Sequence, residues 1–480
     1  MEKLQKYRHW IAIFAVLIVT IAVVAASFGG ETVSPSEEPL TAGKAISLYE
    51  AAVSSVMEMT DISMTVTQTK TVTISGDAIT QESRQELSYT GLGTKKMEGC
   101  VDQTLSIGSH IISIQELYCD NEGYFTVAGI PFRGKITEEE YLSRYTPAAP
   151  ITLEEFSTIS ATANDAGTKI YFTDATAPEK WLTAEKTDFI TSDATAYLDK
   201  NGNLIRSDYN TAYLLNGIEF HVHTTVEIHR DKEISIPKHD DKKAYRKIDY
   251  LDGPRMLEVA CGYLMAADNI TAEYTNDISY HVYGDSLTEK ITLNCHKGDA
   301  WAARVDTEVL LKNIGIGQTV SEAKQTERFV DGEYSISLNG EKVDQALTEE
   351  KMRALCRDRL VGTVMLPDYI RSAKVKKTNK VIRITFTAGE DFAAQIRAGI
   401  CQRLYQEPDL PEQLHQTYTT TAMQCYLELD ATSGLPTAAG IIYEGEYQKD
   451  SISYLMTSQT HQTYDLVSDT AYNAIHKKES

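Results

Sequence analysis

The sequence has few of the features that mark a particular biochemical activity. Its 480 residues include only seven cysteines, too few for a disulfide scaffold, and their odd number leaves at least one thiol unpaired. It contains no G-x-S-x-G, H-E-x-x-H, C-x-x-C or S-x-x-K motif in a fitting context. We therefore predict no catalytic residue, no cofactor site and no metal site, and an enzyme is the least favoured class of function.

Positive charge is also scarce. Lysine and arginine number 46 against 68 aspartate and glutamate residues, which gives a net charge of −22. Nucleic-acid binding needs a basic face, so we predict no nucleic-acid partner. Hydrophobic residues make up 42% of the chain and charged residues 24%, which is ordinary globular usage and excludes wholesale disorder.

An apolar run near the N-terminus predicts a membrane anchor. Trp10 to Phe28 is interrupted only by Thr20 and Ser27, and a helix of this length spans about 28 Å, close to a bilayer core. Basic residues precede the run and acidic residues follow it, so the positive-inside rule puts the N-terminus in the cytoplasm. We predict a cytoplasmic tail over residues 1–9, a transmembrane anchor over 10–28 and a stalk over 29–43.

The predicted location is therefore the cell membrane, crossed once, with the bulk of the chain outside the cell. A cleaved signal peptide is the alternative, and the chain would then be secreted. No cysteine occurs before Cys100, so the sequence offers no lipid-modified N-terminus.

The rest of the chain consists of two similar copies, which form an internal repeat. Leu48–Val66 matches Met256–Tyr274, and Glu116–Gly129 matches Glu327–Gly340. A charged stretch bounded by prolines, Pro237 to Pro254, separates the copies. We predict two domains that fold separately, one over residues 44–238 and one over 254–478, joined by a linker over 239–253. Protease cuts are expected first between Lys238 and Lys247.

Each copy is predicted to contain the same kinds of element. An amphipathic helix opens each, and long strands with apolar and polar residues in alternation follow. The Gly108-Ser109 turn predicts a type II′ hairpin that pairs residues whose numbers sum to 217. Further helices are expected over Thr348–Leu360 and Glu390–Leu404, and closing strands over 221–229 and 452–466.

This order of elements resembles a known family. Hairpins at Asp120–Tyr124 and Asp331–Tyr334, and closing turns at Tyr197–Gly202 and Tyr426–Gly434, are similar to those of the bacterial lipoprotein-carrier fold, the LolA/LppX-like half-barrel. The resemblance covers nearly all of residues 44–470. It implies an α+β fold with two tandem antiparallel half-barrels, each packed with helices. It also implies an apolar concavity that carries a lipid or a lipoprotein.

Two segments imitate ligand-binding loops. Residues 129–136 nearly match a phosphate-binding loop, but Ile136 stands where Ser or Thr must hold magnesium, so a turn is expected. Asp199 to Asn203 imitates the start of an EF-hand, but Leu204 replaces the required glycine, so a hairpin turn is expected there.

Histidines gather late in the first copy. Alternate residues of a strand share a face at about 6.8 Å spacing, which suits zinc. An ordinary strand with one apolar face explains the same pattern, so we assign no metal to His221, His223, His229 and His239.

Cys100 and Cys119 are predicted to be diagonal neighbours across the Gly108-Ser109 hairpin. Their Cα atoms should lie about 7–8 Å apart, beyond the usual disulfide range, so small core residues are the favoured interpretation.

Two hypotheses of function remain. The first is an extracytoplasmic, membrane-anchored binding protein for an apolar or amphipathic ligand, with the second copy as the carrier. The alternative is a structural or interaction module of the bacterial cell surface, whose half-barrels are filled by their own helices and hold no small molecule.

Overall fold

The structure is a computed structural model of the 480-residue chain. It describes residues 38–476, apart from 75–76, 95, 146–155, 176–186, 216, 231, 239–240, 281–284, 314–317, 363, 365–366, 406–417, 450–451 and 468–469.

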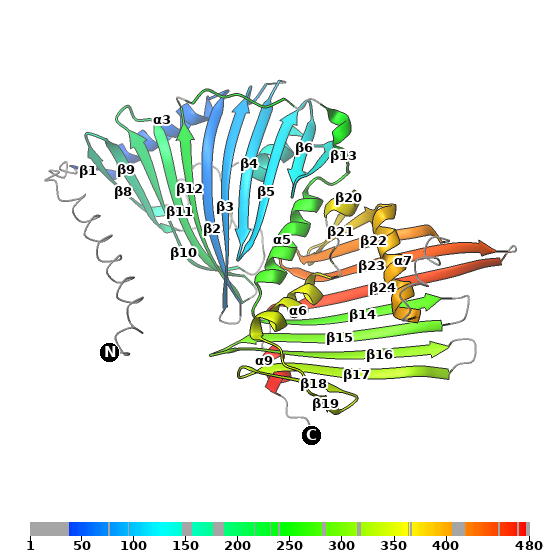
Figure 1. The fold of residues 1–480 in the computed structure, drawn as a ribbon. Coiled ribbons are helices and arrows are strands. Elements are labelled where there is room, and N and C mark those ends of the chain that lie inside the picture. The colour runs from blue at the N-terminus through cyan, green and yellow to red at the C-terminus, as the bar shows by residue number, and fades with distance from the viewer. Residues whose placement is uncertain are drawn as a thin grey trace, which may run out of the picture.

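Two large antiparallel sheets make up most of the molecule (Figure 1). The first has the strand order β1-β8-β9-β10-β11-β12-β2-β3-β4-β5-β6-β7-β13, and only its last pair, β7 with β13, is parallel. Its strands are β1 (Glu38–Leu40), β2 (Ile62–Ile74), β3 (Asp77–Thr90), β4 (Glu98–Ile107), β5 (His110–Cys119), β6 (Glu122–Val127), β7 (Ile130–Lys135), β8 (Phe156–Asn164), β9 (Gly167–Ala175), β10 (Thr187–Asp199), β11 (Leu204–Leu215), β12 (Ile218–His229) and β13 (Arg246–Lys247).

The second sheet has the order β19-β18-β17-β16-β15-β14-β24-β23-β22-β21-β20. Its strands are β14 (Ile270–Tyr280), β15 (Asp285–Lys297), β16 (Trp301–Asn313), β17 (Gln318–Val330), β18 (Glu333–Leu338), β19 (Glu341–Val343), β20 (Ile370–Lys377), β21 (Val381–Ala388), β22 (Thr419–Asp430), β23 (Pro436–Lys449) and β24 (Ile452–Asp465). Read in reverse, from β20 to β19, this order matches the part of the first sheet that runs from β8 to β7. In this match β14 corresponds to β2 and β24 corresponds to β12.

The hairpin turns also correspond between the two sheets. Asp120 and Asn121 turn β5 into β6 with φ of 53° and 59°, and Asp331 and Gly332 turn β17 into β18 with φ of 53° and 79°. Two successive positive φ angles make a type I′ turn, whose twist matches that of the flanking strands. At the Gly108-Ser109 turn, Ile107 pairs with His110, so the predicted register is confirmed.

Few helices accompany the sheets, and they lie on the sheet faces (Figure 1). They are α3 (Ala42–Met57), α4 (Glu138–Tyr145), α5 (Asp252–Ala266), α6 (Glu349–Val361), α7 (Glu390–Tyr405) and α9 (Thr470–His476), with single 3-10 turns at Lys242–Ala244 and Pro367–Tyr369. The helices expected over 348–360 and 390–404 are thus confirmed to within one residue at each end.

Helix α5 contacts both sheets, with β4 and β5 on one side and β20 and β23 on the other. Its Gly262 faces the first sheet, where an added Cβ would lie 2.9 Å from the Cδ1 atom of Ile107. One hydrophobic cluster therefore runs from the first sheet through α5 into the second. The division into separately folding domains stays a prediction.

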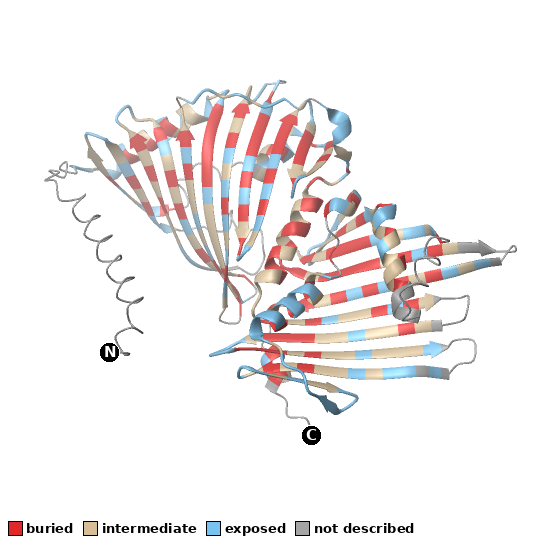
Figure 2. Ribbon diagram, viewed as in Figure 1, coloured by how far each residue is buried: buried red, intermediate tan, exposed pale blue. Residues whose placement is uncertain are grey.

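Burial alternates along the strands, as Figure 2 shows by its red and pale bands. In β2, the apolar residues Ile62, Met64 and Val66 are buried on the face that meets the helices. Successive side chains of a strand point to opposite faces, so one face of each sheet forms core.

Two predictions about the fold class are corrected. The α+β class is wrong because strands dominate the chain and helices cover only parts of the two sheets. Among the described residues, no helix is long and apolar enough to cross a membrane. The helices α3 and α7 have 16 residues each, whereas a spanning helix needs about 20 apolar residues.

The predicted transmembrane anchor therefore receives no support from the structure. The same holds for the three predictions that depended on it: the single-pass topology, the cytoplasmic N-terminus and the membrane as a partner. The segments on which these predictions depended, residues 1–9, 10–28 and 29–37, lie outside the described residues.

Candidate binding groove on the second sheet

A buried ion pair occurs at the same place in both repeats. In the first, Glu116 on β5 receives Arg144 of α4 at 3.1 Å, and in the second, Glu327 on β17 receives Arg359 of α6 at 2.8 Å. The two glutamate side chains are 0% and 5% exposed, so each depends on its arginine for charge compensation.

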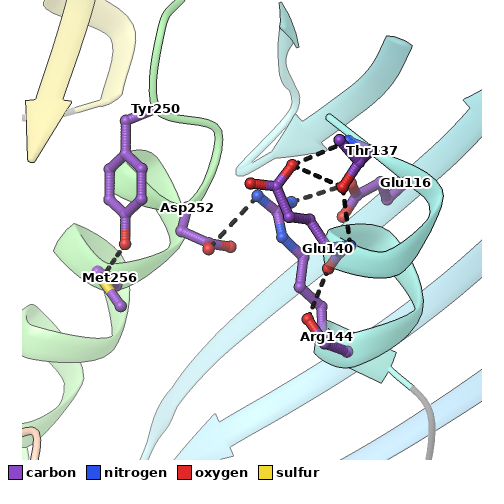
Figure 3. A network of polar contacts seen from close by, with 8 residues as sticks. Glu116, Thr137, Glu140, Arg144, Tyr250, Asp252 and Met256 are labelled. Atoms are coloured by element: carbon purple, nitrogen blue, oxygen red, sulfur yellow. Dashed lines mark hydrogen bonds and ion pairs between the residues drawn. The ribbon is translucent and has the colours of Figure 1, made fainter. Parts of the chain in front are cut away.

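The helix that carries each arginine begins at a capping threonine. Thr137 and Glu140 form a reciprocal capping box, with the Thr137 N–H donating to Glu140 Oε2 at 2.9 Å and the Glu140 N–H donating to Thr137 Oγ1 at 3.1 Å (Figure 3). The Glu140 carboxylate accepts from both the N–H and the hydroxyl of Thr137, and these two hydrogen bonds lower the pKa of Glu140. Thr348 caps α6 by accepting the N–H of Lys351. Arg144 follows its threonine by about two helical turns and Arg359 by about three, and each arginine reaches a glutamate of the sheet.

The two arginines differ in their second partner. Arg144 also reaches Asp252, the first residue of α5, at 3.4 Å (Figure 3). Beside it, Tyr250 donates to the sulfur of Met256 at 3.4 Å, and burial raises the pKa of Tyr250 to about 12. In the second repeat, Arg359 Nη1 is buried and has no hydrogen-bond partner among the described residues. A buried N–H group that lacks an acceptor is costly and needs an explanation.

Arg359 lines a cavity of about 270 Å³ on the α6 face of the second sheet. We call it the α6 groove. Its floor is largely apolar, with Ala272, Ile291 and Leu293 from β14 and β15, and its helical wall includes Leu355, which is 38% exposed. Polar side chains also line it: Glu289 of β15 and Gln462 of β24 come from the sheet, and Asp358 comes from α6.

Helix α7 covers another part of that face, where it buries Ile400 against Tyr443 and Met456. The groove is thus the part of the face that lies beside α6 and is not covered by α7.

The corresponding face of the first sheet is covered in part by α5. Tyr263 of α5 donates to Gln81 of β3 at 2.9 Å, and Glu258 contacts His110 of β5 at 3.0 Å. Further along this face Lys70 lies 5.1 Å from the Phe220 ring, and burial lowers the pKa of Lys70.

A larger hollow of about 690 Å³ lies on the opposite face of the first sheet. Its lining is predominantly charged and polar, as the examples Arg84, Glu86 and Glu227 show. It does not suit an apolar ligand, because such pockets are lined mainly by hydrophobic side chains.

The histidines predicted to share a strand face do so on β12, but each has a local partner. His221 contacts Glu219 at 2.8 Å, His223 contacts Asn210 at 2.6 Å, and His229 contacts Thr65 at 2.8 Å. His239 lies outside the described residues. Within the described part of the chain, no three metal-ligating side chains gather.

The imitations of ligand-binding loops have ordinary structural roles. A turn was expected over residues 129–136, but residues 130–135 form strand β7, so that prediction is wrong for most of the segment. Asp199 accepts the N–H groups of Asn201 and Asn203 at 2.8 Å each, which makes the expected turn between β10 and β11. Cys100 pairs with Leu117 across the β4–β5 ladder, as predicted, and neither it nor Cys119 is in a disulfide.

The α6 groove was not predicted from the sequence. Both glutamates stand in the matched segments that revealed the repeat, at Glu116 and Glu327. A glutamate at a core position of a strand was the available signal, because a buried carboxylate needs a partner.

No family model and no curated protein matches the chain. Among solved structures, it is similar to LprF from Mycobacterium bovis at 9% identity, over 43% of this chain and 98% of that one, with a TM-score of 0.23. It is also similar to an AttH-type protein from Nitrosomonas europaea at 9% identity, over 82% and 92% of the two chains, with a TM-score of 0.13. A distant likeness to LprF is therefore shown, and membership of the lipoprotein-carrier family is not. TM-scores this low carry no argument about function.

Proposed function

We propose that the protein is a binding protein for an uncharged, single-chain amphiphile, which it holds in the α6 groove. The observation that carries this proposal is the difference between two equivalent arginines. Arg144 makes a second ion pair with Asp252 at 3.4 Å, whereas Arg359 Nη1 has no hydrogen-bond partner among the described residues and its side chain lines an open cavity with several apolar residues. A ligand oxygen at Arg359 would take the place that Asp252 has in the first repeat.

The size of the groove favours one chain over two. Ligand pockets commonly enclose about 300–1,000 Å³, and the α6 groove, at about 270 Å³, is at the lower limit. A diacyl phospholipid would leave much of its apolar surface in water, so a ligand with a single alkyl or acyl chain fits better.

The charges of the groove favour an uncharged polar end. Glu327 already balances the charge of Arg359, and Glu289 and Asp358 add two carboxylates to the lining. A free carboxylate on the ligand would be repelled by these groups, whereas an ester or amide carbonyl can accept the Arg359 hydrogen bond without that repulsion.

The test is binding of monooleoylglycerol to the full chain, measured by the displacement of an apolar fluorescent dye. Oleate is the matched anionic probe, and we expect it to bind more weakly. Arg359→Lys keeps a positive charge beside Glu327 but loses the second guanidinium donor. A hydrogen bond to a charged group contributes about 1.5–3 kcal/mol, so we expect at least about tenfold weaker binding.

Arg144→Lys is the control, because Arg144 makes the equivalent ion pair and does not line the groove. It should leave the affinity unchanged. The apolar wall is tested by Leu355→Gln, which should also weaken binding. Absence of saturable binding to the unmodified chain, or equal effects of the two lysine variants, would refute the proposal and favour a structural role.

A further inference from the structure

Strand β20 ends the second sheet, and its counterpart in the first sheet carries an added strand. In the match of the two strand orders, β20 corresponds to β8 (Figure 1). The short strand β1 pairs antiparallel with β8, with Glu38 opposite Ala163 and Leu40 opposite Ala161. Among the described strands, none takes that position beside β20. The first repeat thus shows that this edge of the fold accepts a further strand, and the second repeat leaves the same edge open.

The open edge is also long. β20 has 8 residues, whereas the strands at the other three sheet edges of the described structure, β1, β13 and β19, have 3, 2 and 3. Arg246 of β13 covers the start of β20, where it donates to the carbonyls of Asp368 and Ile370. From Ser372 to Lys377 each residue pairs with β21, and no described backbone group bonds to the outer side. Unpaired N–H and C=O groups along an edge are a template for another chain.

The charges on this edge have one sign. Residues 369–389 include six lysine and arginine residues and no aspartate or glutamate, in a chain whose net charge is −22. Lys374 and Lys376 are exposed on one face of β20, and neither has an ion pair among the described residues. Lys376 lies directly opposite Arg383, whose own partner is Glu428 at 2.7 Å. Like charges that face each other across strands are unfavourable, so a negative charge beside Lys376 would be favourable.

We propose that β20 is a docking edge for an acidic, extended segment of a partner protein, which adds to the second sheet as a strand. Main-chain hydrogen bonds to the outer side of β20 would hold the segment, as in other cases of strand addition. Carboxylates at alternate positions of the segment would lie beside Lys374 and Lys376, because alternate residues of a strand share a face. The segment would take the place that β1 has in the first sheet.

The same lysines disfavour a second copy of β20 as the occupant. Lysine on an exposed edge discourages pairing between copies of one chain, because it places like charges beside one another. An acidic strand meets attraction at the same positions. Three strands, β21 to β23, separate β20 from β24, the nearest strand that lines the α6 groove. The inference therefore goes beyond the proposed function and does not depend on it.

The test uses the full chain and an acetylated six-residue peptide of alternating glutamate and valine, which carries an uncharged fluorescent label. Fluorescence anisotropy should show saturable binding that weakens as sodium chloride is added, because exposed charges are screened. Amide hydrogen exchange over residues 372–377 should become slower on binding, since outward N–H groups gain acceptors. The same peptide with lysine in place of glutamate should bind about fivefold more weakly or less.

Charge reversal on β20 provides the decisive comparison. The double variant Lys374→Glu, Lys376→Glu should exchange the preference, so that the lysine peptide binds more tightly than the glutamate peptide. A folding defect would weaken both peptides and could not produce this exchange. Lys342→Glu is the matched control, because Lys342 is exposed on β19, the edge strand at the other end of the same sheet. It should leave both affinities unchanged.

Three results would overturn the proposal. The first is equal binding of a glutamate peptide with N-methyl groups on alternate residues, which keeps its charges but loses backbone donors, because charge alone would then explain the binding. The second is unchanged exchange over residues 372–377 at saturating peptide. The third is slower exchange over these residues when the chain alone is concentrated, which would identify a second copy as the occupant.

Discussion

Gly262 on α5 offers a direct test of the packing between the two repeats. A Cβ added there would lie 2.9 Å from Ile107 Cδ1, 3.1 Å from Ile107 Cβ and 3.3 Å from His110 Cδ2. Two effects oppose each other in Gly262→Ala. Alanine is favoured over glycine within a helix by about 1 kcal/mol, whereas overpacking of a filled core costs about 1–3 kcal/mol. We expect the variant to be less stable than the unmodified chain by up to about 2 kcal/mol.

Gly399 on α7 is the matched control, because an added Cβ would meet no heavy atom within 4 Å. Gly399→Ala keeps the helix-propensity gain without the clash and should stabilise the chain by about 0.5–1 kcal/mol. Urea unfolding followed by circular dichroism measures both variants. In a double-mutant cycle, Ile107→Val should relieve part of the cost in the Gly262→Ala background, because it removes the atom nearest to the new methyl group. If Gly262→Ala stabilised the chain as much as Gly399→Ala does, α5 would not be packed on the first sheet.

Three more outcomes are expected from the described residues. Lys70→Met should raise the free energy of unfolding at neutral pH, because burial lowers the pKa of Lys70 in the folded state. The unfolded chain then binds more protons than the folded chain, so the unmodified chain should become more stable as the pH increases toward about 10.4. The difference in urea midpoint between Lys70→Met and the unmodified chain should therefore decrease over the same pH range. Thr137→Ala should cost about 1 kcal/mol, and more than Thr348→Ala, because only Thr137 has a reciprocal partner in its capping box; thermal unfolding of the two variants decides this. Limited trypsin digestion should cut after Lys238 before Lys247, because Lys238 is exposed in an irregular segment whereas Lys247 is held in β13; early cuts within the strands of both sheets would contradict the predicted linker.

Local features of the structure were predictable from the sequence. The Gly108-Ser109 turn determined the register of β4 with β5, because a two-residue hairpin loop leaves one pairing once the apolar face is known. Helix α6 begins after Thr348, as its capping threonine indicated. The fold class was predicted wrongly because helix signals are conspicuous in a sequence. The strands of 10 to 14 residues that dominate this chain give weaker sequence signals than helices do.

The parts that were not predictable depend on contacts between distant segments. The pattern of α5 shows an apolar face, but it does not tell which of two sheets that face will meet, and α5 meets both. The Glu327–Arg359 ion pair joins β17 to α6 across two intervening strands, β18 and β19. Spacing in sequence holds no information about such a pair until the order of the strands is known.

The two arginines show how a repeated ion pair can leave a donor without a partner in one copy and not in the other. Both repeats need an arginine to neutralise a buried glutamate, so the Glu116–Arg144 and Glu327–Arg359 pairs are explained by folding alone. A guanidinium has more donors than one carboxylate can satisfy. In the first repeat, Arg144 makes a second ion pair with Asp252, the first residue of α5. In the second, Arg359 Nη1 has no hydrogen-bond partner among the described residues, and the side chain lines the α6 groove. In the proposed function, recognition of the ligand would depend on the second donor of an arginine whose first role is to neutralise a buried glutamate.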